Sequence, residues 1–256
     1  MENRVSSKEN RIYRECQRLT RKKYRDREER YLIEGENLIQ EAIEYGADLD
    51  RLILREDWSQ STDFPVRYYV MDRKLFDTLA QTETSQGILG IVKKRSYRKD
   101  ELPMLLSHRN VVVLDRLQDP GNIGTIIRTA EGAGYGAVIC LKGTADVYSP
   151  KVVRAAAGSL FRMPIVTVAS EQDLFELIRS LKKRLVVTCL EGDCIYYDVN
   201  LTENIALVIG NEGNGASRSL IDQADVRLRI PMKGALESLN ASVAAGILMY
   251  EAMRTK

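Results

Sequence analysis

Three segments of this 256-residue sequence place polar or charged side chains beside glycines, next to apolar stretches. The first segment, NIGTIIRTAEGAG, carries Asn122 and Arg128; the second, IGNEGNG, carries Glu212. The third, IPMKGALESLNASVAAGI, carries Ser238 and Asn240 in front of a helix of small and apolar residues. Glycines let a backbone approach a ligand closely, and helix entrances bind polar or anionic groups. We therefore expect these side chains to form a binding surface.

The one histidine, His108, excludes several other chemistries. It lies in SHRN, ahead of an apolar strand, where a linker position is the simpler interpretation. Any Ser-His-Asp or Cys-His mechanism would depend on it alone, and a His-rich metal site is excluded. The four cysteines form no CxxC pair, so we expect reduced thiols without a metal: Cys16, Cys140, Cys189 and Cys194.

Each segment also has a purely structural interpretation. Asn122 can cap a helix while Arg128 and Glu131 form a surface ion pair, and Ser238 or Asn240 can be an N-cap. The glycines of the second segment can form a plain turn. A phosphate-binding P-loop is disfavoured because no lysine follows those glycines, and GAGYGA follows a helix rather than a strand, unlike a dinucleotide fingerprint.

The net charge of +2 hides an uneven distribution, because residues 4–30 contain eleven Lys or Arg against five Asp or Glu. Tyr13, Tyr24 and Tyr31 are interspersed in this basic run. Basic side chains with stackable aromatics suit an RNA backbone and exposed bases, although a solvated helix face is the alternative. The sequence has no apolar run long enough for a bilayer and no signal peptide at its start, so we expect a cytoplasmic protein without a membrane partner.

The apolar pattern predicts two domains. The first would be a small α/β unit with helices at 34–45 and 73–80 and strands at 52–54, 67–70 and 88–92. The second alternates the apolar runs VVVLDRL, AVICL, PIVTV, LVVTCL and IALVIG and a strand at 226–230 with helices near 123–133, 150–160, 172–183 and 217–223. Such runs indicate strands buried on both faces of a parallel sheet. We predict domain boundaries at 1–95 and 110–256, with a charged linker at 96–109.

Taken in order, the three segments resemble the signature motifs of the SpoU (TrmH-like) RNA ribose 2′-O-methyltransferases, which belong to the SPOUT class. RYLIEGENLIQEAI and the strand-helix order make the first domain similar to the L30e-like substrate-binding domain that often precedes them. The resemblance implies a C-terminal parallel-sheet domain with a trefoil knot, a homodimer and S-adenosylmethionine as cofactor. It places the cofactor near Leu190, Gly192, Gly210, Ile230 and Leu239.

The same resemblance assigns the polar catalytic positions to Asn122, Arg128, Glu212, Ser238 and Asn240. Methyl transfer to a ribose hydroxyl requires in-line alignment of oxygen, carbon and sulfur. Because a guanidinium stays protonated, we interpret Arg128 as a phosphate anchor that stabilises alkoxide charge rather than as a base. Glu212 would orient Arg128 or another group, Ser238 and Asn240 would position the nucleotide, and Asn122 would fix the loop.

We therefore predict an S-adenosylmethionine-dependent RNA methyltransferase, with 23S ribosomal RNA preferred as substrate. Transfer RNA is the alternative substrate. A non-catalytic RNA-binding or ribosome-assembly factor on the same fold is the alternative from another class, but it would not need all five polar positions. A generic nucleotide-binding protein is disfavoured because the phosphate loop is absent.

Overall fold

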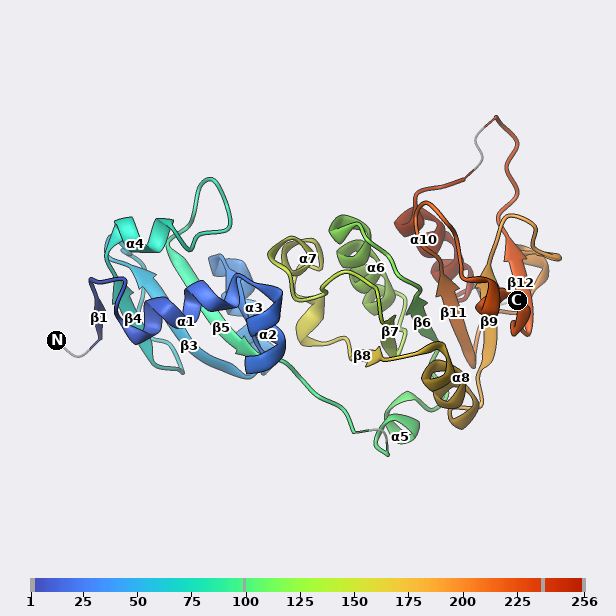
Figure 1. Ribbon diagram of the computed structural model, residues 1–256, viewed down its shortest axis with the longest axis horizontal. Coiled ribbons are helices and arrows are strands. Elements are labelled where there is room, and N and C mark those ends of the chain that lie inside the picture. Colours follow the sequence, from blue (N-terminus) through green and yellow to red (C-terminus); the bar gives the residue numbers. More distant parts are fainter. Residues whose placement is uncertain (1–2, 99, 236–237, 255–256) are drawn as a thin grey trace. The chain divides into compact units, whose positions relative to one another are not determined.

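The computed structural model describes residues 3–98, 100–235 and 238–254, and the chain divides into two compact units (Figure 1). Unit 1 comprises Met1–Arg95 and Tyr148–Phe161. Unit 2 comprises Ser96–Val147 and Arg162–Lys256. A short segment from the second half of the chain is thus part of the first unit.

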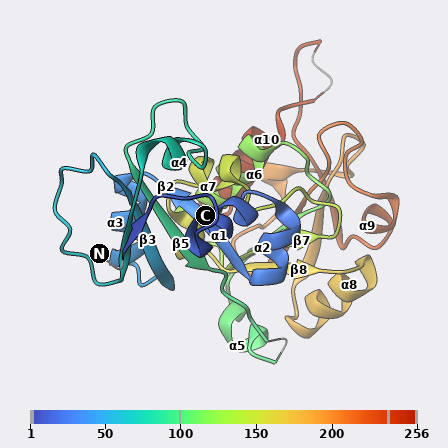
Figure 2. The same ribbon diagram turned by 60° about the vertical axis from the view of Figure 1, so that its left-hand side comes forward.

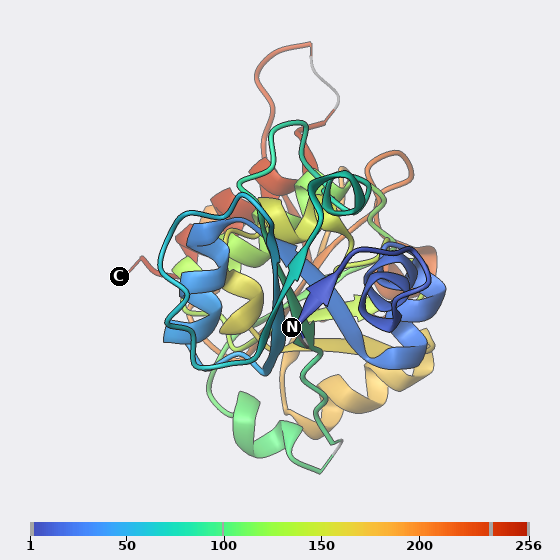
Figure 3. The same ribbon diagram turned by 90° about the vertical axis from the view of Figure 1, so that its left-hand side faces the viewer.

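Unit 1 is a mixed sheet with helices on both faces. Its elements are β1 (Arg4–Val5), α1 (Arg11–Leu19), α2 (Lys22–Glu28), β2 (Arg30–Glu34), α3 (Glu36–Glu44), β3 (Leu49–Arg55), β4 (Tyr68–Met71), α4 (Arg73–Asp77), β5 (Ile88–Lys93), α7 (Pro150–Ala155) and the 3₁₀ helix η1 (Ser159–Phe161). The strand order is β1-β4-β3-β5-β2, in which β5 runs antiparallel to both of its neighbours. Helices α1 and α3 cover opposite faces of this sheet (Figure 3).

Alternation along the strands explains this arrangement, because successive side chains point to opposite faces. Leu32, Ile53 and Leu89 share a buried cluster with the apolar side of α1. On the other face, a Cβ at Gly90 would lie 2.7 Å from Ile39 of α3, so that helix packs directly on the strand. The charged run 4–30 contains two regular helices, and the first of them, α1, has an apolar stripe that it buries.

Unit 2 is a parallel α/β domain, which confirms the predicted fold class. Its elements are α5 (Leu102–Leu106), β6 (Val111–Leu114), α6 (Pro120–Gly132), β7 (Ala137–Leu141), β8 (Ile165–Val168), α8 (Glu171–Ser180), β9 (Arg184–Thr188), β10 (Cys194–Ile195), the 3₁₀ helix η2 (Tyr196–Asp198), β11 (Ile205–Ile209), α9 (Arg218–Asp222), β12 (Val226–Arg229) and α10 (Ala241–Glu251). The strand order is β10-β12-β9-β11-β6-β7-β8, and every pair is parallel. All residues of β6, β7 and β11 are buried, as continuous apolar runs predict.

Helices cover both faces of this sheet. Buried side chains of α5, α8 and α9 belong to one core cluster with alternate residues of the strands. On the other side α6 contacts β7 and packs against α10, and Figure 2 shows these two helices side by side. Helix α5 lies within the segment interpreted as a linker, because Leu102 and Leu106 pack into the core of unit 2.

Strand β11 lies between β6 and β9, although β7 and β8 separate those two strands in the sequence. This order is consistent with the trefoil knot that the family resemblance implies, and the knot itself stays a prediction. All four cysteines are free thiols, and burial raises the pKa of Cys140 to about 12. In the described part of the chain, no helix combines the length and apolar character needed to cross a membrane.

Candidate active site

The loop after β11 is built around Asn211. Its backbone exchanges two hydrogen bonds with Gly215, donating to the Gly215 carbonyl at 2.9 Å and accepting from the Gly215 amide at 2.8 Å. Its Oδ1 accepts from the amides of Gly213 (3.0 Å) and Asn214 (3.1 Å). Sequence reasoning gave Asn211 no role, although an asparagine two residues before a glycine is a signal for such a side-chain turn.

Glycine at position 210 is required by close backbone packing. A Cβ there would lie 2.1 Å from the amide nitrogen of Ala216, which is far inside contact distance. The loop therefore folds directly back over the end of β11. Gly192 is similarly constrained, because its Cβ would lie 2.5 Å from the carbonyl carbon of Leu228 in β12.

The Glu212 carboxylate projects from this loop to the entrance of α6. Oε2 accepts from the Gln118 amide (3.0 Å), and Oε1 accepts from the Asp119 amide (2.9 Å) and from Nδ2 of Asn122 (3.2 Å). Partial burial opposes ionisation, but these hydrogen bonds outweigh it and hold the pKa of Glu212 below its usual range. The carboxylate is thus kept charged next to a helix N-terminus, which favours negative charge.

Asn122 lies in the first turn of α6 rather than at its cap. The N-cap is Asp119, whose Oδ1 accepts from the Asn122 amide at 2.8 Å, and Pro120 is the first helical residue. The interpretation of Asn122 as a capping residue is therefore wrong. Its buried side chain is free to donate to Glu212 and to accept, through Oδ1, from Nδ2 of Asn240 at 2.9 Å.

Asn240 connects this pair to α10. Its Oδ1 accepts from the amides of Ser242 (2.9 Å) and Val243 (3.3 Å), so Asn240 is the N-cap of that helix. The capping interpretation and the functional interpretation of Asn240 both hold, because its Nδ2 remains available for Asn122. Hydrogen bonds thus join Glu212, Asn122 and Asn240, one residue from each of the three segments. We call this chain of residues the polar network.

Arg128 is exposed on α6, and none of the described residues forms a hydrogen bond or ion pair with its guanidinium. It lies six residues beyond Asn122, which is less than two helical turns. The surface ion pair between Arg128 and Glu131, which was the structural alternative for this segment, is not formed, because Glu131 instead binds Arg162, with Nη2 3.1 Å from Oε2. Among the described side chains, Glu212 therefore hydrogen-bonds Asn122 and not Arg128, the one partner that was named for it from the sequence.

Ser238 is exposed at the entrance of α10, and Leu239 beside it is half-buried. Glu237, which the sequence also placed on this polar loop, lies outside the described residues together with Leu236. The structure therefore brings Asn122, Glu212 and Asn240 into contact and leaves Arg128 and Ser238 at the surface.

The residues expected to hold the cofactor follow strands that are neighbours in the sheet. Leu190 and Gly192 come after β9, Gly210 after β11 and Ile230 after β12, and the sheet order places these strands as β12-β9-β11. Carboxyl ends of parallel strands share one edge, where α/β ligands bind. The Cys189 amide donates to the Leu228 carbonyl at 2.9 Å, which joins the carboxyl end of β9 to β12.

This edge suits S-adenosylmethionine. Leu190 is 70% exposed, so an apolar side chain lies open beside the glycine backbones, as an adenine ring requires. Leu239 lies in a different segment, directly before Asn240 of the polar network. Among the residues described here, no three His, Cys, Asp or Glu side chains are grouped as metal ligands.

Comparison with known families matches both parts of the chain. The SpoU rRNA Methylase family model matches residues 109–250, and the MRM3-like substrate binding domain model matches residues 10–90. The 23S rRNA (guanosine(2553)-2′-O)-methyltransferase RlmP of Bacillus subtilis is 33% identical over 96% of this chain and 97% of its own. The 23S rRNA (uridine(2479)-2′-O)-methyltransferase of Streptomyces viridochromogenes is 32% identical over 99% and 92%.

Two solved structures show the same fold. The SpoU methyltransferase AviRb from Streptomyces viridochromogenes, in complex with AdoMet, has a TM-score of 0.87 and 31% identity, covering 95% of this chain and 97% of its own. An AdoMet-bound rRNA methyltransferase from Sinorhizobium meliloti has a TM-score of 0.86 and 31% identity, covering 97% and 96%.

The parallel sheet, the glycine-bounded strand ends and the polar network define a methyltransferase of the SPOUT class. More specifically, the chain belongs to the SpoU rRNA methylase family. The family and the methyltransferase activity predicted from the sequence are thereby confirmed.

Proposed function

We propose that this protein transfers a methyl group to one ribose 2′-hydroxyl of 23S ribosomal RNA. The two relatives named above carry this activity in their names, and each is matched over nearly its whole length. The observation that carries the proposal for this chain is the polar network, because it connects all three segments beside the strand ends that suit the cofactor. A fold retained only for RNA binding would not need this connection.

S-adenosylmethionine is the methyl donor, and when bound it supplies an electrophilic methyl group. Main-chain groups at Gly210 and Ile230 would hold it, with Leu190, Gly192 and Leu239 around it. The polar network holds the entrances of α6 and α10 in a fixed relation before RNA arrives. Such preorganisation keeps the hydroxyl of the bound nucleotide in line for transfer.

Arg128 has a separate role in this proposal. Its guanidinium is exposed and unpaired among the described residues, so it can bind the phosphate next to the target ribose. It stays protonated and stabilises negative charge developing on the 2′-oxygen, an effect worth roughly 3 kcal/mol in comparable sites. The hydroxyl proton would leave to that phosphate or to water. Ser238, exposed beside Asn240, would contact the nucleotide.

The proposal includes a cytoplasmic homodimer formed through α10. Val243, Tyr250 and Met253 are 50%, 54% and 52% exposed, and their spacing of seven and three residues places them on one side of the helical segment. Exposed large apolar side chains on one face indicate a protein interface. Sedimentation of the wild type and of Tyr250→Lys would test it, since a dimer through α10 predicts that only the variant is a monomer.

Mapping of ribose methylation in ribosomal and transfer RNA tests the function directly. Cells with and without the gene would be compared, with wild-type and Arg128→Ala proteins restored separately. We expect one 2′-O-methyl mark of 23S rRNA to vanish and to return only with the wild type. Loss of a transfer RNA mark instead would reassign the substrate, and persistence of every mark would contradict the proposed activity.

A further inference from the structure

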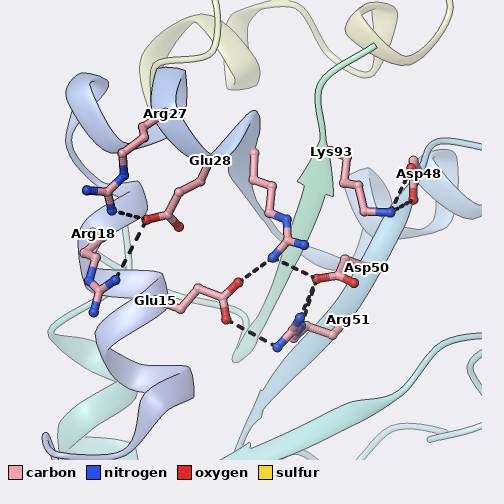
Figure 4. Close-up of polar contacts among 9 residues, drawn as sticks. Glu15, Arg18, Arg27, Glu28, Asp48, Asp50, Arg51 and Lys93 are labelled. Carbon is pink, nitrogen blue, oxygen red and sulfur yellow. Dashed lines mark hydrogen bonds and ion pairs between the residues drawn. The ribbon is translucent and has the colours of Figure 1, made fainter. Parts of the chain in front are cut away.

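Arginines of unit 1 occur in two environments, and the first is structural. Figure 4 shows Glu15 of α1 facing Asp50 and Arg51 of β3. Arg51 binds Glu15 at 3.3 Å and Asp50 at 2.6 Å, while Arg30 of β2 binds Glu15 at 2.7 Å and Asp50 at 3.4 Å. The four side chains are only 12–27% exposed. These charges neutralise one another and hold α1 on the sheet.

The second environment is a cavity of about 270 Å³ on the outer side of α1 and α2. We call it the arginine pocket, and the residues that line it are Arg14, Gln17, Arg18, Arg21 and Tyr24. Three of these five residues are arginines, and no carboxylate of the described residues lines the pocket. The opposite side of α1 is buried, so the helix is anchored and its arginines are presented on a fixed surface.

Nearby carboxylates neutralise this pocket only weakly. Arg14 pairs with Glu9, but both side chains are exposed, at 49% and 77%. Arg18 lies 3.9 Å from Glu28, which also binds Arg27 at 2.8 Å. The first pair is weak because both side chains are exposed and screened by salt, and the second because it is long and shares Glu28 with Arg27, so a phosphate can replace both.

Arg21, between the two helices, has no side-chain partner among the described residues. Tyr24 adds an aromatic ring to the same pocket. The ring is half-buried, and the Arg27 guanidinium lies 4.8 Å from its centroid. Aromatic rings in basic grooves stack on nucleobases, and arginine adds cation–π attraction. A base can stack in this way only when its face is uncovered, which excludes a base inside a duplex.

We propose that the arginine pocket binds one unpaired nucleotide of the substrate RNA, with its phosphate among the three arginines and its base against Tyr24. The inference rests on the proposed function, because it takes the substrate to be RNA. It adds that unit 1 distinguishes a loop or bulge from a regular helix. The RNA must therefore present an unstacked nucleotide to unit 1 in addition to the one that is methylated.

Binding of a short fluorescent single-stranded RNA and of the fully paired duplex of the same sequence would be measured by anisotropy with the full chain. Tyr24→Leu removes stacking, and Tyr24→Phe retains it. We expect Tyr24→Leu to weaken single-strand binding by about 5- to 150-fold with little effect on the duplex. Tyr24→Phe should bind like the wild type. The proposed stacking on Tyr24 would be overturned if Tyr24→Leu bound the single strand as tightly as the wild type does, or if it lost the same affinity for both RNAs.

The arginines are tested by the salt dependence of single-strand binding. Replacing Arg14, Arg18 and Arg21 together by alanine should lower the slope of log affinity against log salt by roughly 0.7, the value for one phosphate of a single strand. Arg73→Ala is the matched control, because this arginine is 62% exposed on α4 and lines no part of the pocket. An unchanged slope in the triple variant would overturn the phosphate contacts.

Calorimetric binding of S-adenosylmethionine separates this proposal from the proposed function. If the arginine pocket does not bind RNA, the wild type still binds S-adenosylmethionine and still methylates its substrate. Failure of the proposed function removes methylation in the wild type, while the dependence of RNA binding on Tyr24 persists. The side chains concerned are exposed or half-buried, and thermal unfolding of each variant would confirm its fold.

Discussion

The polar network of unit 2 and the arginine pocket of unit 1 use polar side chains in opposite ways. In the network, Glu212, Asn122 and Asn240 hydrogen-bond one another and four backbone amides, so their positions are set before any ligand binds. In the pocket, the arginines have weak partners or none. Fixed groups suit alignment of a reacting atom, whereas unpaired cations suit a flexible phosphate chain. Arg128 is exposed and unpaired among the described residues, like Arg21 of the pocket, although it lies on the same helix as Asn122 of the network.

The largest expected effect comes from Arg128, and it tests whether an unpaired cation serves the chemistry. Arg128→Ala should lower kcat by about 10²–10³-fold, because charge on the 2′-oxygen loses its stabilising partner. The affinity for S-adenosylmethionine should remain unchanged. Single-turnover methylation and calorimetry would measure the two quantities. Full activity in this variant would remove Arg128 from the mechanism.

A substitution at Gly210 tests whether the loop that carries Glu212 of the polar network is rigidly packed. In Gly210→Ala the new Cβ would meet the Ala216 amide nitrogen at 2.1 Å, so the loop carrying Glu212 must shift. We expect the free energy of unfolding to fall by about 1–3 kcal/mol, as for other overpacked sites. Gly234→Ala is the control, since a Cβ there meets nothing within 4 Å. Urea denaturation would compare both, and equal stability of the two variants would contradict the close packing.

Asn122→Ala would break the polar network at its centre. Glu212 loses one donor and Asn240 loses its acceptor, while the backbone amides still hold the carboxylate. We expect kcat to fall by on the order of tenfold, or about 1.4 kcal/mol, which lies within the range expected for the two hydrogen bonds that are lost. Asn214→Ala is the control, because Asn214 lies on the same loop as Glu212 and its side chain binds Asn211 rather than a residue of the network. Single-turnover rates that do not distinguish the two variants would argue against a positioning role.

The smallest effect is a pH dependence of stability from Glu212. Its folded-state pKa lies below the ordinary value of 4.5, so its stabilising contribution is present above that value and is lost as the pH falls through the folded pKa. At neutral pH, Glu212→Gln should lose on the order of 1 kcal/mol of unfolding free energy. The difference from the wild type should shrink below about pH 4.5. Denaturation curves at several pH values would show a constant difference if Glu212 contributes no charge effect.

Sequence patterns predicted six of the seven described strands of the parallel sheet and missed β10, which has only two residues. The runs of β6, β7 and β11 contain only buried residues, and runs of that kind indicate strands covered on both faces. The same patterns failed at helix α5, which is too short to show a periodicity and was interpreted as linker. The start of α6 was placed three residues late, because Asp119 and Pro120 were taken for loop.

The sequence by itself determined the family and the types of the functional side chains, because glycines at strand ends and polar residues at helix entrances leave local signals. It did not determine which of these side chains meet. The bond between Asn122 and Asn240 joins residues 118 positions apart, and the arginine pocket depends on how α1 and α2 pack. Only the tertiary structure decided both, because contacts between distant segments depend on sheet order and helix packing rather than on neighbouring residues.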